Sequence, residues 1–236
     1  MMRKNVAFYI SEHGYGHAVR TLEVVRLLAN QNGVDTIYVR TAAPRSVLTD
    51  VDHPPVHLCS LETGRLDNGA KEDHSPLVIN PRRTLDAVAL LLQNREQIVD
   101  DEADFIRQKQ VALVVADIPF LAGDIAYRAG VPRFALGNFT WDWIYEAYLS
   151  EFPQFASDLQ TIRHSYQLMT RWLRLSFHHD SDLFGNIVDL PLIARKSTMA
   201  SALPSEMPYF SKRIEIRDII CTRFKIYVRW QSNVVN

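Results

Sequence analysis

The feature that most constrains the fold is a regular alternation of short apolar runs with longer segments of helical periodicity. The runs at 5–11, 35–41, 56–61, 111–117 and 133–138 are rich in β-branched and aromatic residues and have the length of strands. Between most of them, apolar residues recur every three or four positions. Alternating strands and helices with short connections indicate βαβ units and therefore a parallel sheet between helices. We predict a Rossmann-like, doubly wound α/β fold with helices on both faces of the sheet.

The predicted helices differ in how clearly the sequence marks them. The segment at 81–106 carries one apolar stripe, which Arg95 and Glu96 interrupt, so we expect a bend or an end there. The segment at 119–130 begins at a proline and ends at a glycine, a common helix pattern. Helices are expected near 18–29, 44–50, 81–106, 119–130, 140–149 and 155–173, with a further strand at 174–177.

The amino-acid composition is that of an ordinary globular protein. The 236 residues are 47% hydrophobic and 22% charged, which is enough apolar material for a sizeable core. A formal net charge of -1 gives no reason to expect a nucleic-acid partner, and no apolar stretch reaches the roughly 18 residues of a membrane span. Two cysteines fit a reducing compartment, and the apolar run near the start is interpreted as a strand rather than a signal peptide. We expect a cytoplasmic protein.

The first candidate site is the glycine-containing segment "SEHGYGHAVR", in which His13 and His17 flank Gly14, Tyr15 and Gly16. Histidines four apart can bind zinc on a helix, but the glycines make a helical start before the second histidine unfavourable, and no third ligand stands out. We therefore expect no metal site. The segment "FHHDSD" at 177–182 also has metal-like composition, and we interpret it as a solvated loop.

Two nucleotide-binding patterns are also incomplete. A dinucleotide fingerprint would need glycine where Val19 stands, and a phosphate loop at 64–71 would need lysine where Ala70 stands. We expect no bound cofactor. What remains is a strand, a glycine-containing turn and a helix, an arrangement whose free N–H groups favour anions or developing negative charge.

His17 and Asp117 form the candidate catalytic pair. An imidazole at the start of this helix is suited to act as a general base near neutral pH. Asp117 ends the clearest strand of the chain, and if the first and fourth strands are neighbours, its carboxylate can reach His17 and orient the ring. Two plainer interpretations stay open at this point. His17 only caps its helix, or Asp117 only caps the helix that begins near Pro119.

The third candidate segment is "GNFTWDWIYEAY", which combines aromatic rings with hydrogen-bonding groups, as sugar-binding and ring-binding sites do. We expect one or two of its rings to be buried structure. Asn138, Trp141 and Asp142 are the expected ligand contacts.

These motifs carry a resemblance. "SEHGYGHAVR", "VVADIP" and "NFTWDWIYEAY" resemble the N-terminal lobe of GT-B glycosyltransferases, particularly glycosyltransferase-like proteins and the amino-terminal region of plant L-arabinokinases. More loosely, His17-Ala18 and the following "LEVVRLL" are similar to the first helix of UDP-sugar glycosyltransferases, whose catalytic histidine and aspartate match His17 and Asp117. The resemblance spans roughly residues 5 to 195.

The resemblance implies transfer of a sugar from a nucleotide-linked donor, expected to carry UDP, to an acceptor hydroxyl. His17 would remove the acceptor's proton, Asp117 would orient the imidazole, and Gly14 to Gly16 would lie near the donor diphosphate. His13 and Tyr15 belong to the expected substrate contacts. The co-substrate replaces a cofactor, and the acceptor is expected to be a small sugar or glycoside.

The same resemblance sets the expected domains. Residues 1–190 are predicted to form the acceptor-side lobe, and residues 191–236 to be a linker or the truncated start of a second lobe. We therefore expect transfer to be incomplete without that second lobe. The alternative is a non-catalytic sugar- or nucleotide-binding module, such as the front end of a sugar kinase of the L-arabinokinase type.

Overall fold

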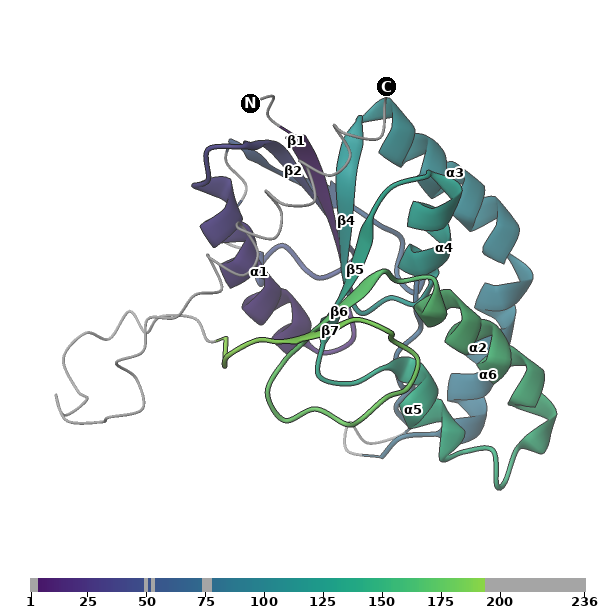
Figure 1. The fold of residues 1–236 in the computed structure, drawn as a ribbon. Coiled ribbons are helices and arrows are strands. Elements are labelled where there is room, and N and C mark those ends of the chain that lie inside the picture. The colour runs from purple at the N-terminus through teal and green to yellow at the C-terminus, as the bar shows by residue number, and fades with distance from the viewer. Residues whose placement is uncertain (1–3, 49–50, 52–53, 74–77, 194–236) are drawn as a thin grey trace, which may run out of the picture.

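A computed structural model describes residues 4–48, 51, 54–73 and 78–193. The strands form one seven-stranded parallel sheet in the order β3-β2-β1-β4-β5-β6-β7. The predicted Rossmann-like, doubly wound sheet is confirmed (Figure 1). The strands are β1 (Lys4–Ile10), β2 (Val34–Thr41), β3 (Val56–Ser60), β4 (Val111–Asp117), β5 (Arg133–Gly137), β6 (Arg171–Arg174) and β7 (Ile187–Asp189).

The helices cover the two faces of the sheet unequally. In β1, Val6 and Phe8 pack with α1 on one face, while Ala7 and Tyr9 pack in the core beneath the other helices. Figure 1 shows α1 on one side of the sheet and α2, α3, α4, α5 and α6 on the other. These helices are α1 (Tyr15–Ala29), α2 (Pro81–Gln93), α3 (Arg95–Gln108), α4 (Leu121–Arg128), α5 (Trp141–Glu146) and α6 (Ala156–Gln167).

The long helical segment divides where its apolar stripe is interrupted. α2 begins at Pro81, with the side chain of Asn80 accepting a hydrogen bond from the Arg83 N–H at 2.9 Å. Asn94 ends α2 and precedes α3, and its φ of -98° and ψ of 7° are not helical. The expected break beside Arg95 is confirmed.

Two expected elements are wrong. Of the helix expected at 44–50, residues 44–48 form two i→i+3 turns without helical i→i+4 hydrogen bonds, and residues 49–50 lie outside the described residues. The sixth strand lies at Arg171–Arg174, three residues earlier than expected, because its ladder with β5 pairs Trp172 with Ala135. Phe177 instead lies in an exposed loop with a φ of 61°.

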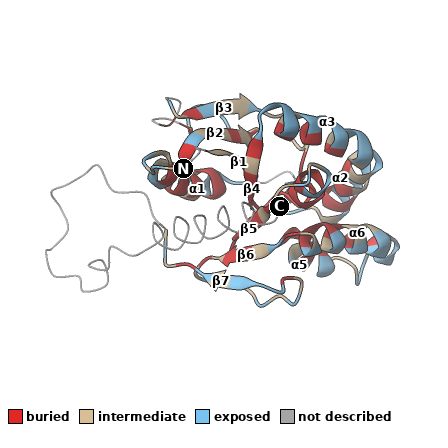
Figure 2. Cartoon of the chain, turned by 45° about the horizontal axis from the view of Figure 1, so that its top comes forward, coloured by how far each residue is buried: buried red, intermediate tan, exposed pale blue. Residues whose placement is uncertain are grey.

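Figure 2 shows burial concentrated along β1, β4 and β5 and on the inward faces of the helices. No helix within the described ranges is long and apolar enough to cross a membrane. Residues 194–236, which hold almost all of the expected linker or second-lobe start, lie outside the described residues. The domain boundary near residue 190 therefore stays a prediction.

Candidate functional site

The site lies where β1 and β4 end side by side in the centre of the sheet. Ile10 is paired with Asp117, and the Ser11 N–H donates to the Asp117 carbonyl at 2.7 Å. The chain runs outward from β1 to β2 and β3 on one side, and from β4 to β5 and β6 on the other. This is the topological switch point, where parallel sheets of this type leave a crevice for ligands.

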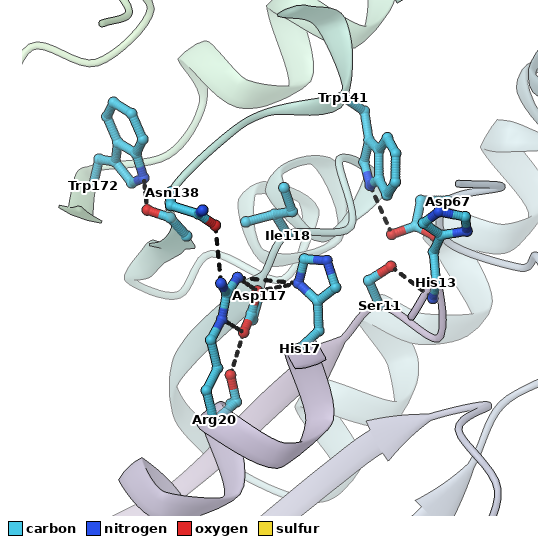
Figure 3. A network of polar contacts seen from close by, with 12 residues as sticks. Ser11, His13, His17, Arg20, Asp67, Asp117, Ile118, Asn138, Trp141 and Trp172 are labelled. Carbon is cyan, nitrogen blue, oxygen red and sulfur yellow. Dashed lines mark hydrogen bonds and ion pairs between the residues drawn. The ribbon is translucent and has the colours of Figure 1, made fainter. Parts of the chain in front are cut away.

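His17 and Asp117 meet at this edge, as the sequence predicts. The Nδ1 atom of His17 lies 2.7 Å from Oδ1 of Asp117, and both residues are buried, with exposures of 7% and 0%. Gly14 has a φ of 72°, which turns the chain into α1 without strain. The helix begins at Tyr15 and includes Gly16, so the expectation that Gly16 opposes a helical start before His17 is wrong. His17 thus lies in the first turn with its ring directed at the strand edge (Figure 3).

Asp117 is held by donors from two turns of α1. Besides His17, Arg20 donates from Nε to Oδ2 at 3.0 Å and from Nη2 to Oδ1 at 2.7 Å, and the Thr21 hydroxyl donates to Oδ2. Burial by itself raises the pKa of Asp117, but the charges of His17 and Arg20 outweigh it and lower that pKa to about 2. Asp117 is therefore an ionised carboxylate at every ordinary pH.

The ionisation of Asp117 decides the tautomer of His17. An ionised carboxylate only accepts hydrogen bonds, so the proton of the 2.7 Å contact belongs to Nδ1 of His17. When the ring is neutral, its Nε2 atom then carries the free lone pair. Arg20 Nη2 lies 3.1 Å from the same Nδ1 because both groups donate to one oxygen of Asp117. The geometry leaves one imidazole nitrogen able to accept a proton.

Asn138 extends the network to the end of β5. Its side-chain oxygen accepts from Arg20 Nη1 at 2.9 Å, and its backbone carbonyl accepts from the His179 N–H at 3.1 Å. Phe139 meets the ring of His17 edge-on, with 5.5 Å between ring centroids. Arg20 therefore connects α1 with the ends of both β4 and β5 (Figure 3).

His13 lies on the other side of the site, beside Asp67. The His13 N–H donates to the Ser11 hydroxyl at 3.2 Å, and its ring meets Trp141 edge-on at 5.2 Å. Burial lowers the pKa of the His13 ring, and the charge of His17 acts in the same direction. Gly69 packs so closely that a Cβ atom there would lie 2.4 Å from the His13 ring, so this position requires glycine.

Asp67 is a second buried carboxylate at the site, and no pattern in the sequence predicts it. It is 3% exposed and accepts a hydrogen bond from the Trp141 indole N–H at 3.2 Å. Burial raises its pKa to about 6, although its polar contacts with Ser11 and Trp141 and the charge of His17 oppose the rise. Asp67 and Asp117 therefore differ strongly in proton affinity within one site.

The aromatic segment divides between core and surface. Trp141 and Asp142 are 2% and 5% exposed, with Asp142 Oδ2 lying 3.3 Å from Arg163 Nε. Trp143 is 49% exposed and stacks on His179 with centroids 4.8 Å apart. The expectation that one or two rings are buried structure is confirmed, and the exposed indole of α5 is that of Trp143. The ligand contacts expected of Trp141 and Asp142 stay predictions.

The remaining expected substrate contacts lie in the exposed turn at the rim of the site. Gly14, Tyr15 and Gly16 are exposed, with Tyr15 59% exposed. The segment 177–182 is a loop of exposed and half-buried residues, as expected. The half-buried ring of His179 stacks on Trp143 and also lies near Trp172. Within the described ranges, no three His, Cys, Asp or Glu side chains are placed to hold a metal ion.

Arg20 and Thr21 were missed, although the sequence holds a signal for them. They follow His17 by three and four residues on α1, so they share its face of the helix. Any strand-end carboxylate that reaches His17 therefore also reaches these two side chains.

Comparisons with known proteins agree with this architecture. The chain is 29% identical to L-arabinokinase of Arabidopsis thaliana over 193 residues, which are 80% of this chain and 18% of that protein. It superposes with a TM-score of 0.52 on UGT2 of Phytolacca americana, solved with UDP-2fluoro-glucose and pterostilbene, at 12% identity over 84% of this chain and 56% of UGT2. The glycotransferase of kitacinnamycin gives a TM-score of 0.52 at 14% identity, over 88% and 61% of the two chains.

The chain has the fold of a GT-B lobe. The strand order and the two superpositions carry this conclusion, and at these identities the superpositions show the fold alone. No family model matches the chain. The GT-B-like lobe spans less than two thirds of each of these three relatives.

Proposed function

We propose that this lobe is the acceptor side of a glycosyltransferase that moves a sugar from a UDP-linked donor to an acceptor hydroxyl. His17 is the general base and Asp117 its orienting partner. A second lobe supplies most donor contacts in this proposal. The observation that carries it is the buried 2.7 Å contact between His17 Nδ1 and an ionised Asp117 at the switch point of the sheet.

The chemistry follows from that contact. The acceptor oxygen attacks the anomeric carbon while its proton passes to Nε2 of His17, and Asp117 stabilises the imidazolium that results. The new bond to the acceptor oxygen forms as the bond to the diphosphate breaks, so the nucleotide diphosphate leaves with the electron pair and the anomeric centre inverts. A positioned base of this kind contributes about 10²- to 10⁴-fold in rate.

The surrounding residues have supporting roles in the proposal. The exposed turn at Gly14 to Gly16, at the N-terminus of α1, lies beside the donor diphosphate, where unpaired N–H groups and the helix dipole favour negative charge. His13 and Tyr15 contact the substrates from the same turn. Trp143 offers an exposed indole face to a sugar ring or a planar acceptor.

A second candidate function is supported by the similarity to L-arabinokinase, which covers 80% of this chain. In that reading the lobe is the front end of a sugar kinase and binds a sugar or nucleotide without transferring a glycosyl group. Phosphoryl transfer would then depend on a separate domain, and His17 would serve binding only.

The experiment is a transfer assay with the whole protein that carries this lobe, using radiolabelled UDP-sugars and a panel of sugar and glycoside acceptors. His17→Ala is expected to lower kcat by about 10²- to 10⁴-fold. His164→Ala, an exposed histidine on α6, is the matched control and is expected to retain wild-type transfer.

Unchanged transfer by His17→Ala would contradict the assignment of the base. If the wild-type protein transfers no sugar but phosphorylates a free sugar, and His17→Ala leaves the rate constant of that phosphorylation unchanged, the kinase reading replaces the transferase reading.

A further inference from the structure

Arg20 is placed to control the proton affinity of His17. Its guanidinium pairs with both oxygens of Asp117 at 3.0 and 2.7 Å, and its third nitrogen donates to Asn138 at 2.9 Å. The Arg20 side chain is 20% exposed and that of Asp117 is not exposed at all, so solvent screens this pair only weakly. A two-point pair of this kind holds the carboxylate in one orientation.

The charges around His17 have opposing effects. A bare carboxylate against an imidazole stabilises the imidazolium and raises its proton affinity. Here the negative charge of that carboxylate is already balanced by the positive charge of Arg20, whose Nη2 is 3.1 Å from the imidazole Nδ1. Arg20 therefore repels a second proton on the ring while it leaves the orienting hydrogen bond in place.

We propose that Arg20 is a positioning residue that offsets the charge of Asp117, so that Asp117 orients His17 but stabilises the imidazolium less than an unpaired carboxylate would. In a simple His–Asp pair, one carboxylate both orients the imidazole and raises its proton affinity. Here Asp117 orients the ring, and Arg20 offsets the effect of the Asp117 charge on the proton affinity. The catalytic meaning of this inference rests on the proposed function, but the electrostatic effect does not.

Among the residues that the structure describes, four charged or titratable groups face His17. Arg20 lies on its own helix, Asp117 at the end of β4, His13 in the preceding turn and Asp67 in the loop after β3. Asp67 favours a protonated imidazole, whereas Arg20 and a protonated His13 disfavour one. Arg20 and Asp117 are in direct contact with the Nδ1 atom of His17, so their balance dominates.

The test is an NMR titration of the His17 ring in the full chain, which requires no transfer activity. Arg20→Met is expected to move the midpoint of His17 protonation to higher pH by about one unit, a tenfold rise in proton affinity. Arg20→Lys keeps the charge and loses the bidentate ion pair with Asp117, so it is expected to move the midpoint less than Arg20→Met does. Arg26→Met removes an arginine of the same helix that pairs with Glu23, and is expected to leave the midpoint unchanged.

A midpoint that stays in place or falls in Arg20→Met would overturn the inference. If Arg20→Met unfolds, Arg20→Gln is the second variant, because it removes the charge and keeps a hydrogen-bond donor, and an unmoved midpoint in it would overturn the inference in the same way. The two proposals fail separately. Loss of the transferase assignment leaves the titration result standing, and an unmoved midpoint leaves the test of His17→Ala intact.

Discussion

Two buried carboxylates near β1, Asp117 and Glu102, have similar partners, because each pairs with an arginine and contacts a ring-bearing side chain. Asp117 pairs with Arg20 and touches His17, while Glu102 pairs with Arg40 and accepts a hydrogen bond from the Tyr9 hydroxyl at 3.0 Å. Both carboxylate side chains are at most 3% exposed. The two groups lie at neighbouring register positions but on opposite faces of the sheet, because Asp117 meets side chains of α1, whereas Tyr9 and Arg40 meet Glu102 of α3.

The partner of each carboxylate makes the difference. Burial and the charge of Glu102 raise the pKa of Tyr9 well above its usual value, so this hydroxyl keeps its proton at any ordinary pH. His17 instead is an imidazole, a side chain able to act as a general base, and it lies at the carboxyl ends of the strands, where ligands bind in sheets of this type. A buried acid–arginine pair therefore becomes a candidate site only when its third member is a possible general base that faces the crevice at the switch point of the sheet.

The largest expected effect is on stability, and it comes from Glu102→Gln, which is not expected to change the protonation of His17. Glu102→Gln leaves the Arg40 guanidinium without its counter-charge in a buried place and is expected to lower the free energy of unfolding by about 3–5 kcal/mol. The same variant is expected to leave the midpoint of His17 protonation unchanged. Urea denaturation measures the first quantity and NMR titration the second.

Arg82→Ala is the control for the stability measurement. Arg82 pairs with Asp86 on the surface of α2, where both side chains are more than half exposed, so its loss is expected to cost no more than about 0.5 kcal/mol. If Glu102→Gln lowered the free energy of unfolding as little as Arg82→Ala does, the Glu102 group would contribute no structural stability, and its contrast with the Asp117 group would be wrong.

A smaller effect distinguishes Asp67 from Asp117 by pH. Both start from an ordinary pKa of 3.8, and the fold moves them to about 6 and about 2. The raised pKa of Asp67 means that the folded state binds its proton more tightly, so stability rises as pH falls from about 6 to about 4. The lowered pKa of Asp117 gives stability that is present above about 4 and is lost as pH falls towards 2.

Each contribution is about 2–3 kcal/mol, from roughly 1.4 kcal/mol per pKa unit. Asp67→Asn is expected to remove the gain in unfolding free energy between pH 7 and 4, and to be more stable than the wild type at pH 7. Asp117→Asn is expected to remove the loss below pH 4. Denaturation curves at pH 7, 5, 4 and 2.5 measure both, and identical pH profiles for Asp67→Asn and the wild type would contradict the assignment.

The central part of the fold was predictable because its signals are local and strong. β1 and β4 are seven-residue strands built mostly of apolar residues, and the Pro119-to-Gly130 segment is bounded by residues that start and end helices. β7 was missed because it is a three-residue edge strand whose first and last residues are exposed, which leaves no apolar pattern. The position of β6 is set by pairing with β5, which periodicity does not encode.

The candidate site was predictable only in part for the same physical reason. The meeting of His17 and Asp117 follows from strand order, and the position of Arg20 follows from helical spacing once that meeting is known. Asp67 comes from a polar loop without periodicity, and only the folded chain brings it under Trp141. Spacing at i and i+2 also does not say whether Trp141 or Trp143 is buried.

The most direct test of the central claim is the tautomer of neutral His17, read by long-range ¹H–¹⁵N NMR of histidine-labelled protein. The account predicts a proton on Nδ1, bonded to Asp117, and an unprotonated Nε2. In Asp117→Asn that preference is expected to weaken. A neutral ring that carries its proton on Nε2 in the wild-type protein would contradict the account, because the nitrogen assigned as the base would have no lone pair to offer.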